Sequence, residues 1–146
     1  MILTLNVKLV CGRHAEDGWQ GVLEIDATAT LDDLHQAIQR AVDFDNDHLY
    51  HFYLSRSERS RESARLYNLD EDDDFDADEL PIENLNALFP LPKDKKLFYL
   101  FDYGDNWLFQ VSLSRKKPFP CVVGTEYPRL VEAFGNKPQQ YVDWDE

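Results

Sequence analysis

The stretch from Lys96 to Arg115, KLFYLFDYGDNWLFQVSLSR, constrains the fold more than any other part of the chain. Apolar residues recur at every second position on both sides of a break at Gly104, Asp105 and Asn106, and such alternation predicts two β-strands. Glycine, aspartate and asparagine tolerate the positive φ angles of tight turns. The stretch is therefore predicted to form a long β-hairpin.

One face of this hairpin is strongly apolar. In a single register it carries the large side chains of Leu97, Tyr99, Phe101, Trp107, Phe109, Val111 and Leu113. Burying each of them contributes on the order of 1.5–3 kcal/mol before the loss of conformational entropy is subtracted. We therefore expect the rest of the chain to cover this face.

The segments before the hairpin predict two strands and a helix. Residues 2–10 and 19–25 alternate between apolar and polar side chains, and their short connection favours an antiparallel pair. Leu31 to Val42 carries apolar residues at helical spacings of three and four. Thr30 is the expected N-cap of this helix, with Asp33 completing a capping box.

The remaining segments are assigned more coarsely. Residues 48–54 predict a third strand with two largely apolar faces, which is typical of an interior strand. Residues 55–79 are polar and charged, and are expected to form a long, mobile loop. Short helices are predicted within 82–89 and 127–135, the second because a proline and a glycine flank it. Residues 136–146 are expected to form a loose acidic tail.

These assignments predict a single α+β domain over residues 1–146. The order is β-β-α-β, a long loop, a short helix, β-β and a second short helix. The sheet is expected to be mixed and largely antiparallel, with a helix covering one face. The first half is ordered like a β-grasp unit, an analogy of fold that implies no activity.

Charge and hydropathy limit the classes of partner. The formal net charge is −13, and eight of the 28 acidic residues lie in 70–79. A surface with this much negative charge repels phosphate backbones. A nucleic-acid partner is therefore not expected. No segment approaches the roughly 20 apolar residues of a membrane span, and the N-terminal stretch predicts a strand rather than a signal peptide. We therefore expect a cytoplasmic protein that does not contact membranes.

The acidic run also suggests a calcium loop. Asp72, Asp74 and Asp76 fall at the first, third and fifth positions of an EF-hand-like pattern. Ala77 stands where that loop needs glycine, and Pro81 interrupts it. A solvated loop that binds cations weakly is therefore the favoured interpretation, and these aspartates are weak calcium candidates.

Three motifs stand in order along the chain: TLDDLHQAI at 30–38, HLYHF at 48–52 and YLFDYGDNW at 99–107. Together they resemble the plasmid pRiA4b ORF-3-like family, in which a Y-P-R segment follows the hairpin, here at 127–129. Many members then carry a C-P-P-E-D-x-G-G stretch, where this chain reads LVEAFGNKPQQY. The resemblance implies a compact α+β domain, found on plasmids, near mobile elements and in many chromosomes, without an established biochemical activity.

His35, His48, His51, Asp102 and Asp105 carry the side chains that could do chemistry, and all of them except His35 are also weak metal candidates. In a regular strand His48 and His51 point to opposite faces, so they could share an ion only if His48 precedes the strand. An acid–base or metal site would place one histidine beside Asp102. The favoured alternative is that the aspartates accept hydrogen bonds from turn amides and the histidines are hydrogen-bonded groups at the edge of the core, because no nucleophile or phosphate-binding loop accompanies them.

The leading hypothesis is a non-enzymatic module, without a cofactor, that binds an unknown protein or peptide. It would bind along an exposed sheet edge or on the aromatic surface around the hairpin turn. That surface comprises His48, His51, Asp102, Tyr103, Gly104, Asp105 and Trp107. One alternative is a metal-assisted or acid–base enzyme using His48 or His51 with Asp102 and Asp105. The other is a DNA-associated accessory protein of mobile elements, and the oligomeric state stays open.

Overall fold

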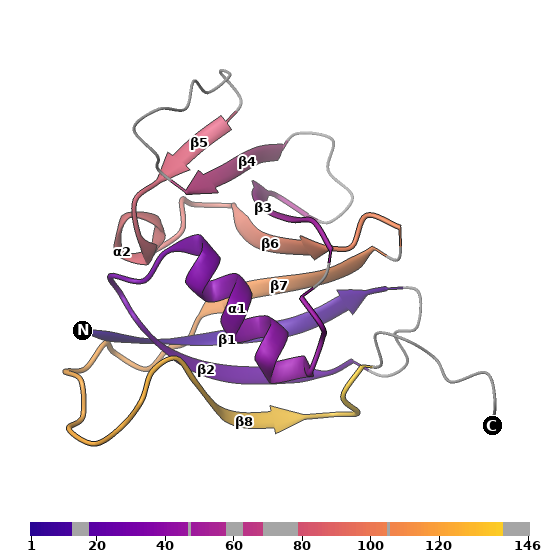
Figure 1. Ribbon diagram of the computed structural model, residues 1–146. Helices are drawn as coiled ribbons and strands as arrows, with labels where there is room; N and C mark the ends of the chain where they lie inside the picture. Colours follow the sequence, from indigo (N-terminus) through magenta and orange to yellow (C-terminus); the bar gives the residue numbers. More distant parts are fainter. Residues whose placement is uncertain (13–17, 47, 58–62, 69–78, 105, 139–146) are drawn as a thin grey trace, which may run out of the picture.

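The structure is a computed structural model that describes residues 1–12, 18–46, 48–57, 63–68, 79–104 and 106–138. The strands are β1 Ile2–Cys11, β2 Gln20–Asp26, β3 Tyr50–Ser55, β4 Ser63–Asn68, β5 Glu79–Ile82, β6 Lys96–Phe101, β7 Trp107–Leu113 and β8 Arg129–Phe134. The helices are α1 Leu31–Val42 and α2 Leu85–Leu88. The strands form one eight-stranded sheet in the order β5-β4-β3-β6-β7-β1-β2-β8 (Figure 1).

The sheet is mostly antiparallel. Neighbouring strands run antiparallel throughout, except for the parallel pair β4 and β5. With two helices beside it, the chain fits the α+β class. The chain begins β-β-α-β as expected, but β6 and β7 lie between β1 and β3 in the sheet.

The predicted hairpin is confirmed as β6 and β7, and it lies at the centre of the sheet. Leu97 pairs with Val111, Tyr99 with Phe109 and Phe101 with Trp107. All six of these side chains are fully buried in one hydrophobic core, against which Leu113 also packs. Period-two alternation therefore identified the apolar face correctly.

Helix α1 has the predicted bounds, and Figure 1 shows it lying across one side of the sheet. The Thr30 hydroxyl accepts a hydrogen bond from the Asp33 N–H at 3.1 Å, and an Asp33 carboxylate oxygen accepts the Thr30 N–H at 2.9 Å. Leu34 and Ile38 are fully buried in the same core as the apolar face of the hairpin. The capping box fixes where the helix begins, and the apolar stripe fixes which side it buries.

Two further predictions concern the elements around this core. Strand β3 lies between β4 and β6, so the expectation of an interior strand is confirmed. The short helix before the hairpin is confirmed as α2, which buries Leu85 and Leu88. Among the described residues no helix is both long enough and apolar enough to cross a membrane.

The prediction of a helix at 127–135 is wrong, because residues 129–134 form strand β8 beside β2. A proline before the segment and a glycine after it suit a strand between two turns as well as a helix. Leu130, Val131 and Phe134 are β-branched or bulky residues that favour a pleated surface. The open edge of β2 supplies hydrogen-bond partners that the local pattern does not reveal.

The segment 55–79, expected to be a loop, contains β4 and the first residue of β5. Leu66 on β4 is buried in the core, whereas its neighbour Arg65 is exposed. The high charge of the surrounding residues concealed this short alternation. Residues 58–62 and 69–78, which include the calcium candidates Asp72, Asp74 and Asp76, lie outside the described residues, as do residues 139–146 of the predicted tail.

Candidate functional site

The turn between β6 and β7 is organised by Asp102, whose φ is 63°. One carboxylate oxygen accepts the Gly104 N–H at 3.0 Å, and the Asp102 carbonyl accepts the Asn106 N–H at 2.6 Å. The Asp102 N–H donates to the Leu49 carbonyl at 3.0 Å. The predicted role of Asp102 in binding turn amides is therefore confirmed, while Asp105 lies outside the described residues.

His48 is placed beside Asp102 because it precedes β3 rather than belonging to it. Its Nε2 lies 3.4 Å from the second carboxylate oxygen of Asp102. The side chain of His48 is 38% exposed and that of Asp102 only 10%. The imidazole ring also packs edge-on against Phe101, at 5.8 Å between ring centroids. A carboxylate that orients a solvent-accessible imidazole is one component of an acid–base site.

His51 does not join this pair. It pairs in register with Leu100, so its side chain points away from the core that its neighbour Phe52 enters. Its Nδ1 lies 3.0 Å from the hydroxyl of Tyr103. Burial, and secondarily the positive charge of Arg65, lower the pKa of His51 to about 4. His51 is therefore neutral at pH 7.

The other members of the predicted surface separate by exposure. Tyr103 is 43% exposed, and Gly104 is also exposed. Trp107 is fully buried and packs against Phe44 at 5.0 Å between ring centroids, so its side chain contributes no surface. Within the described part of the chain, no group of three histidine, cysteine, aspartate or glutamate side chains is arranged to hold a metal ion.

A polar cluster lies between α1 and the sheet, in which His35, Gln39 and Tyr99 are buried and Asn46 is exposed. His35 Nε2 lies 2.5 Å from the Asn46 Oδ1, which can only accept, so this nitrogen carries the proton. His35 Nδ1 then accepts the Tyr99 hydroxyl proton across 2.5 Å. Gln39 Nε2 donates to the Tyr99 oxygen at 2.9 Å, and the Gln39 Oε1 accepts the Asn46 N–H at 3.1 Å. The four residues close a ring of hydrogen bonds.

This ring holds neutral groups. Burial lowers the pKa of His35 and raises the pKa of Tyr99, so both side chains remain uncharged at pH 7. His35 also stacks on Tyr50, with 3.6 Å between ring centroids and 6° between the planes. The cluster joins α1 to β6 by hydrogen bonds in which each of its four side chains takes part, which indicates a structural role. Sequence analysis named His35 as a candidate but did not predict its partners, although polar residues four apart on an apolar helix face, His35 and Gln39, are a signal of such a contact.

The sheet ends at β8, whose exposure contrasts with the buried strands around the hairpin. All six of its residues are exposed, including the apolar side chains of Leu130 at 39%, Val131 at 43% and Phe134 at 57%. Leu130 pairs with Leu23 and Glu132 with Val22, so Val131 is the extra residue of a β-bulge.

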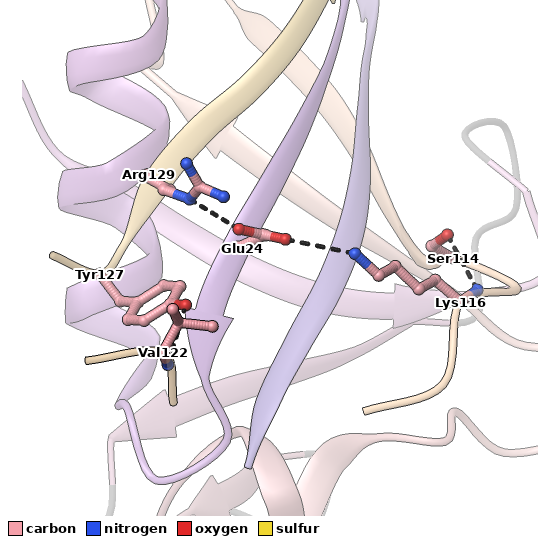
Figure 2. A network of polar contacts seen from close by, with 6 residues as sticks. All are labelled: Glu24, Ser114, Lys116, Val122, Tyr127 and Arg129. Carbon is pink, nitrogen blue, oxygen red and sulfur yellow. Dashed lines mark hydrogen bonds and ion pairs between the residues drawn. The ribbon is translucent and has the colours of Figure 1, made fainter. Parts of the chain in front are cut away.

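A buried carboxylate ties β8 to the sheet from the side facing away from α1 (Figure 2). The side chain of Glu24 on β2 is 4% exposed. Arg129 Nε donates to one of its oxygens at 2.6 Å, and Lys116 Nζ lies 3.6 Å from the other. Figure 2 shows the two cations approaching Glu24 from opposite sides. Arg129 and Glu24 are 105 positions apart in the sequence, so no local pattern could predict this contact.

Comparisons with known proteins identify the family that the three sequence motifs resemble. The similar proteins are described without a biochemical activity. A family model described as plasmid pRiA4b ORF-3-like protein matches residues 4–143. The uncharacterized protein y4hQ of Sinorhizobium fredii (strain NBRC 101917 / NGR234) is 33% identical over 115 residues, which are 79% of this chain and 54% of that protein. This chain thus spans about half the length of that relative.

A solved structure supports the fold. The crystal structure of the protein of unknown function MM3350 from Methanosarcina mazei Go1 is similar, with a TM-score of 0.68 and 23% identity. The similarity covers 90% of this chain and 68% of that one. At this identity the likeness shows a shared fold and no more.

Proposed function

The chain belongs to the plasmid pRiA4b ORF-3-like family, and we propose that it is a non-enzymatic interaction module that binds an extended protein or peptide segment along β8. The observation that carries this proposal is the exposure of the whole terminal strand, all six residues of Arg129–Phe134. A partner strand beside β8 would extend the sheet by backbone hydrogen bonds, and alternate side chains would provide specificity.

The two edges of the sheet differ in how well they can accept such a strand. An edge strand presents backbone N–H and C=O groups on its outer side, and proteins commonly block them with proline or charge. The edge strand β5 contains Pro81, which has no N–H to donate. Strand β8 contains no proline, and it exposes Leu130, Val131 and Phe134. The composition of the edges therefore favours β8 as the docking strand.

The bulge at Val131 favours a short partner. A bulge interrupts regular pairing and increases the local twist, so a long ladder cannot continue through it without a matching irregularity. A segment that pairs with one side of the bulge is compatible with this geometry. Limited pairing also suits a reversible binding site better than open-ended strand stacking.

Lysine substitutions on β8 test this proposal. The probes are fluorescein-labelled seven-residue peptides of alternating valine and threonine, in which a central position is varied. Binding is measured by fluorescence anisotropy. We expect Val131→Lys and Phe134→Lys to weaken binding about tenfold or more, because charge on an edge opposes strand addition. Val123→Lys is the matched control, because Val123 is 99% exposed and outside β8.

Two results would overturn the proposal. One is that no probe binds, or that the β8 variants bind as tightly as the control. The other is that β8 binds a second copy of the chain, because an edge strand can also pair with itself. Sedimentation velocity would then show a dimer that increases with concentration and disappears in Phe134→Lys.

One observation supports the acid–base alternative: Nε2 of His48 lies 3.4 Å from a carboxylate oxygen of Asp102. Calorimetric titration with Zn²⁺ separates its metal-assisted form from the interaction module. Stoichiometric binding to the wild-type protein that is lost in His48→Gln would favour the enzyme. The interaction module predicts no such site.

Three expectations accompany the proposal. We expect no DNA binding even at low salt, where electrostatic affinity is greatest, because the formal net charge is −13. Cytoplasmic residence is supported by Cys11 and Cys121, which are exposed thiols and suit a reducing compartment. The likeness to a β-grasp unit is proposed only for the order of the first four elements.

A further inference from the structure

A hollow of about 180 Å³ lies between α1 and β8. Its apolar lining comes from Leu23, Ala37, Ala41, Pro128 and Leu130. Pockets for cofactors and drug-sized ligands occupy about 300–1,000 Å³, so this hollow is too small for them. Its size suits a single side chain of a docked segment.

The charged residues that line the hollow are all cationic: Arg40, Arg129 and Lys137. This local excess is unusual in a chain with 28 acidic and 15 basic residues. A group that enters the hollow therefore meets a positive potential, which favours a carboxylate over an amide or an ammonium group.

Neighbouring carboxylates reduce this potential but do not reverse it. Arg129 contacts Glu24 at 2.6 Å, and Lys137 contacts Asp43 at 2.6 Å. The pair of Arg129 and Glu24 lies on the face of the sheet away from α1 (Figure 2). On the α1 side the charges are therefore Arg40 and Lys137 against Asp43, and the cations still outnumber the carboxylates. The C-terminal end of α1 adds only about half a negative charge.

The hollow lies directly beside the proposed docking strand, β8. Leu130 pairs with Leu23, which is buried in the core, so Leu130 lies on the α1 side of the sheet and lines the hollow. Every second side chain of a strand added beside β8 would lie on this same side. One of those side chains is placed to enter the hollow near Arg40 and Lys137.

From this placement we infer that the hollow binds an acidic side chain, aspartate or glutamate, of the segment that docks on β8. The inference rests on the proposed function, because it requires an extended segment beside β8. It adds the chemistry of recognition: backbone pairing holds the segment, and the carboxylate selects it and sets its register.

Paired probes test the selectivity separately from docking. Two valine–threonine peptides differ only in glutamate or glutamine at the central position, and anisotropy measures their affinities. We expect the glutamate peptide to bind about tenfold more tightly, as hydrogen bonds between charged groups exceed neutral ones by this amount. Arg40→Gln and Lys137→Gln should reduce this preference towards one while leaving the affinity for the glutamine peptide unchanged. Lys93→Gln, an exposed lysine outside the lining, is the control.

The outcomes distinguish the two proposals. Equal affinities of the glutamate and glutamine peptides, both weakened by Val131→Lys, would overturn the inference and leave docking on β8 intact. If Arg40→Gln and Lys137→Gln still prefer the glutamate peptide, the acidic side chain binds outside the hollow, and the inference is overturned as well. If neither peptide binds, both proposals fail.

Discussion

Tyr99 shows how a single residue can serve both the apolar and the polar interior. Its ring packs against Phe52 at 4.8 Å and Phe109 at 5.8 Å between centroids, which is the role that period-two alternation predicted. Its hydroxyl completes the buried ring with His35 and Gln39, which sequence analysis did not predict. These partners lie 64 and 60 positions away, so only the folded chain brings them together.

We predict that Tyr99→Phe destabilises the protein by roughly 1–3 kcal/mol. The substitution retains the packed ring but leaves His35 Nδ1 and Gln39 Nε2 without the oxygen that they contact. Unfolding in urea measures the change in free energy. Tyr103→Phe is the control, and a smaller loss is expected because Tyr103 is 43% exposed and water can replace its hydroxyl. Equal losses in the two variants would show that the buried ring contributes nothing beyond packing.

His51 gives a prediction for pH dependence. Its pKa is about 4 in the folded protein, below the ordinary value of 6.5. Between these values the unfolded chain binds the proton and the folded chain does not, so this group lowers the free energy of unfolding as the pH falls from 6.5 towards 4. The loss is at most about 1.4 kcal/mol per pH unit, and it should be absent in His51→Gln. In an NMR titration the His51 ring should change protonation near pH 4, and a midpoint near 6.5 would contradict the account.

At the scale of elements, local signals predicted α1 and the hairpin of β6 and β7 because each carries its own pattern. The capping box of Thr30 and Asp33 and the apolar stripe marked α1, and strict alternation marked both strands. Strands β4 and β8 are short and lie at or next to an edge of the sheet. They form only by pairing with a neighbouring strand, so their sequences alone did not distinguish a strand from a loop or a helix. At the candidate site, the same local reasoning predicted the turn contacts of Asp102 but not the placement of Glu24.

The ion pair of β8 with β2 should be asymmetric in its energetics. We predict that Arg129→Gln destabilises the protein more than Glu24→Gln, by about 2 kcal/mol against less than about 1 kcal/mol. Removing Arg129 leaves a carboxylate that is 4% exposed with only Lys116 nearby, whereas removing the carboxylate leaves cations that water can reach, since Arg129 is 50% exposed. Hydrogen exchange of β8 amides should increase in Arg129→Gln. The reverse order of the two variants would contradict this explanation.

At the scale of the whole molecule, the fold places a buried core at the centre of the sheet and an accessible strand at one end. The hairpin occupies the middle of the strand order, and β8 terminates it (Figure 1). The pair of His48 and Asp102 lies before β3 and in the turn between β6 and β7, whereas the hollow lined by Arg40 and Lys137 lies between α1 and β8. The two candidate sites therefore make separable predictions about where a ligand binds.

The most direct test is an NMR titration of the isotopically labelled protein with the glutamate-containing valine–threonine peptide. If a segment docks on β8 with its glutamate in the hollow, amide shifts should change in Arg129–Phe134 and in the last turn of α1 around Arg40. Amides around Asp102 and Tyr103 should remain unchanged. Changes confined to the hairpin turn, with β8 unaffected, would contradict docking on β8 and would return attention to His48 and Asp102.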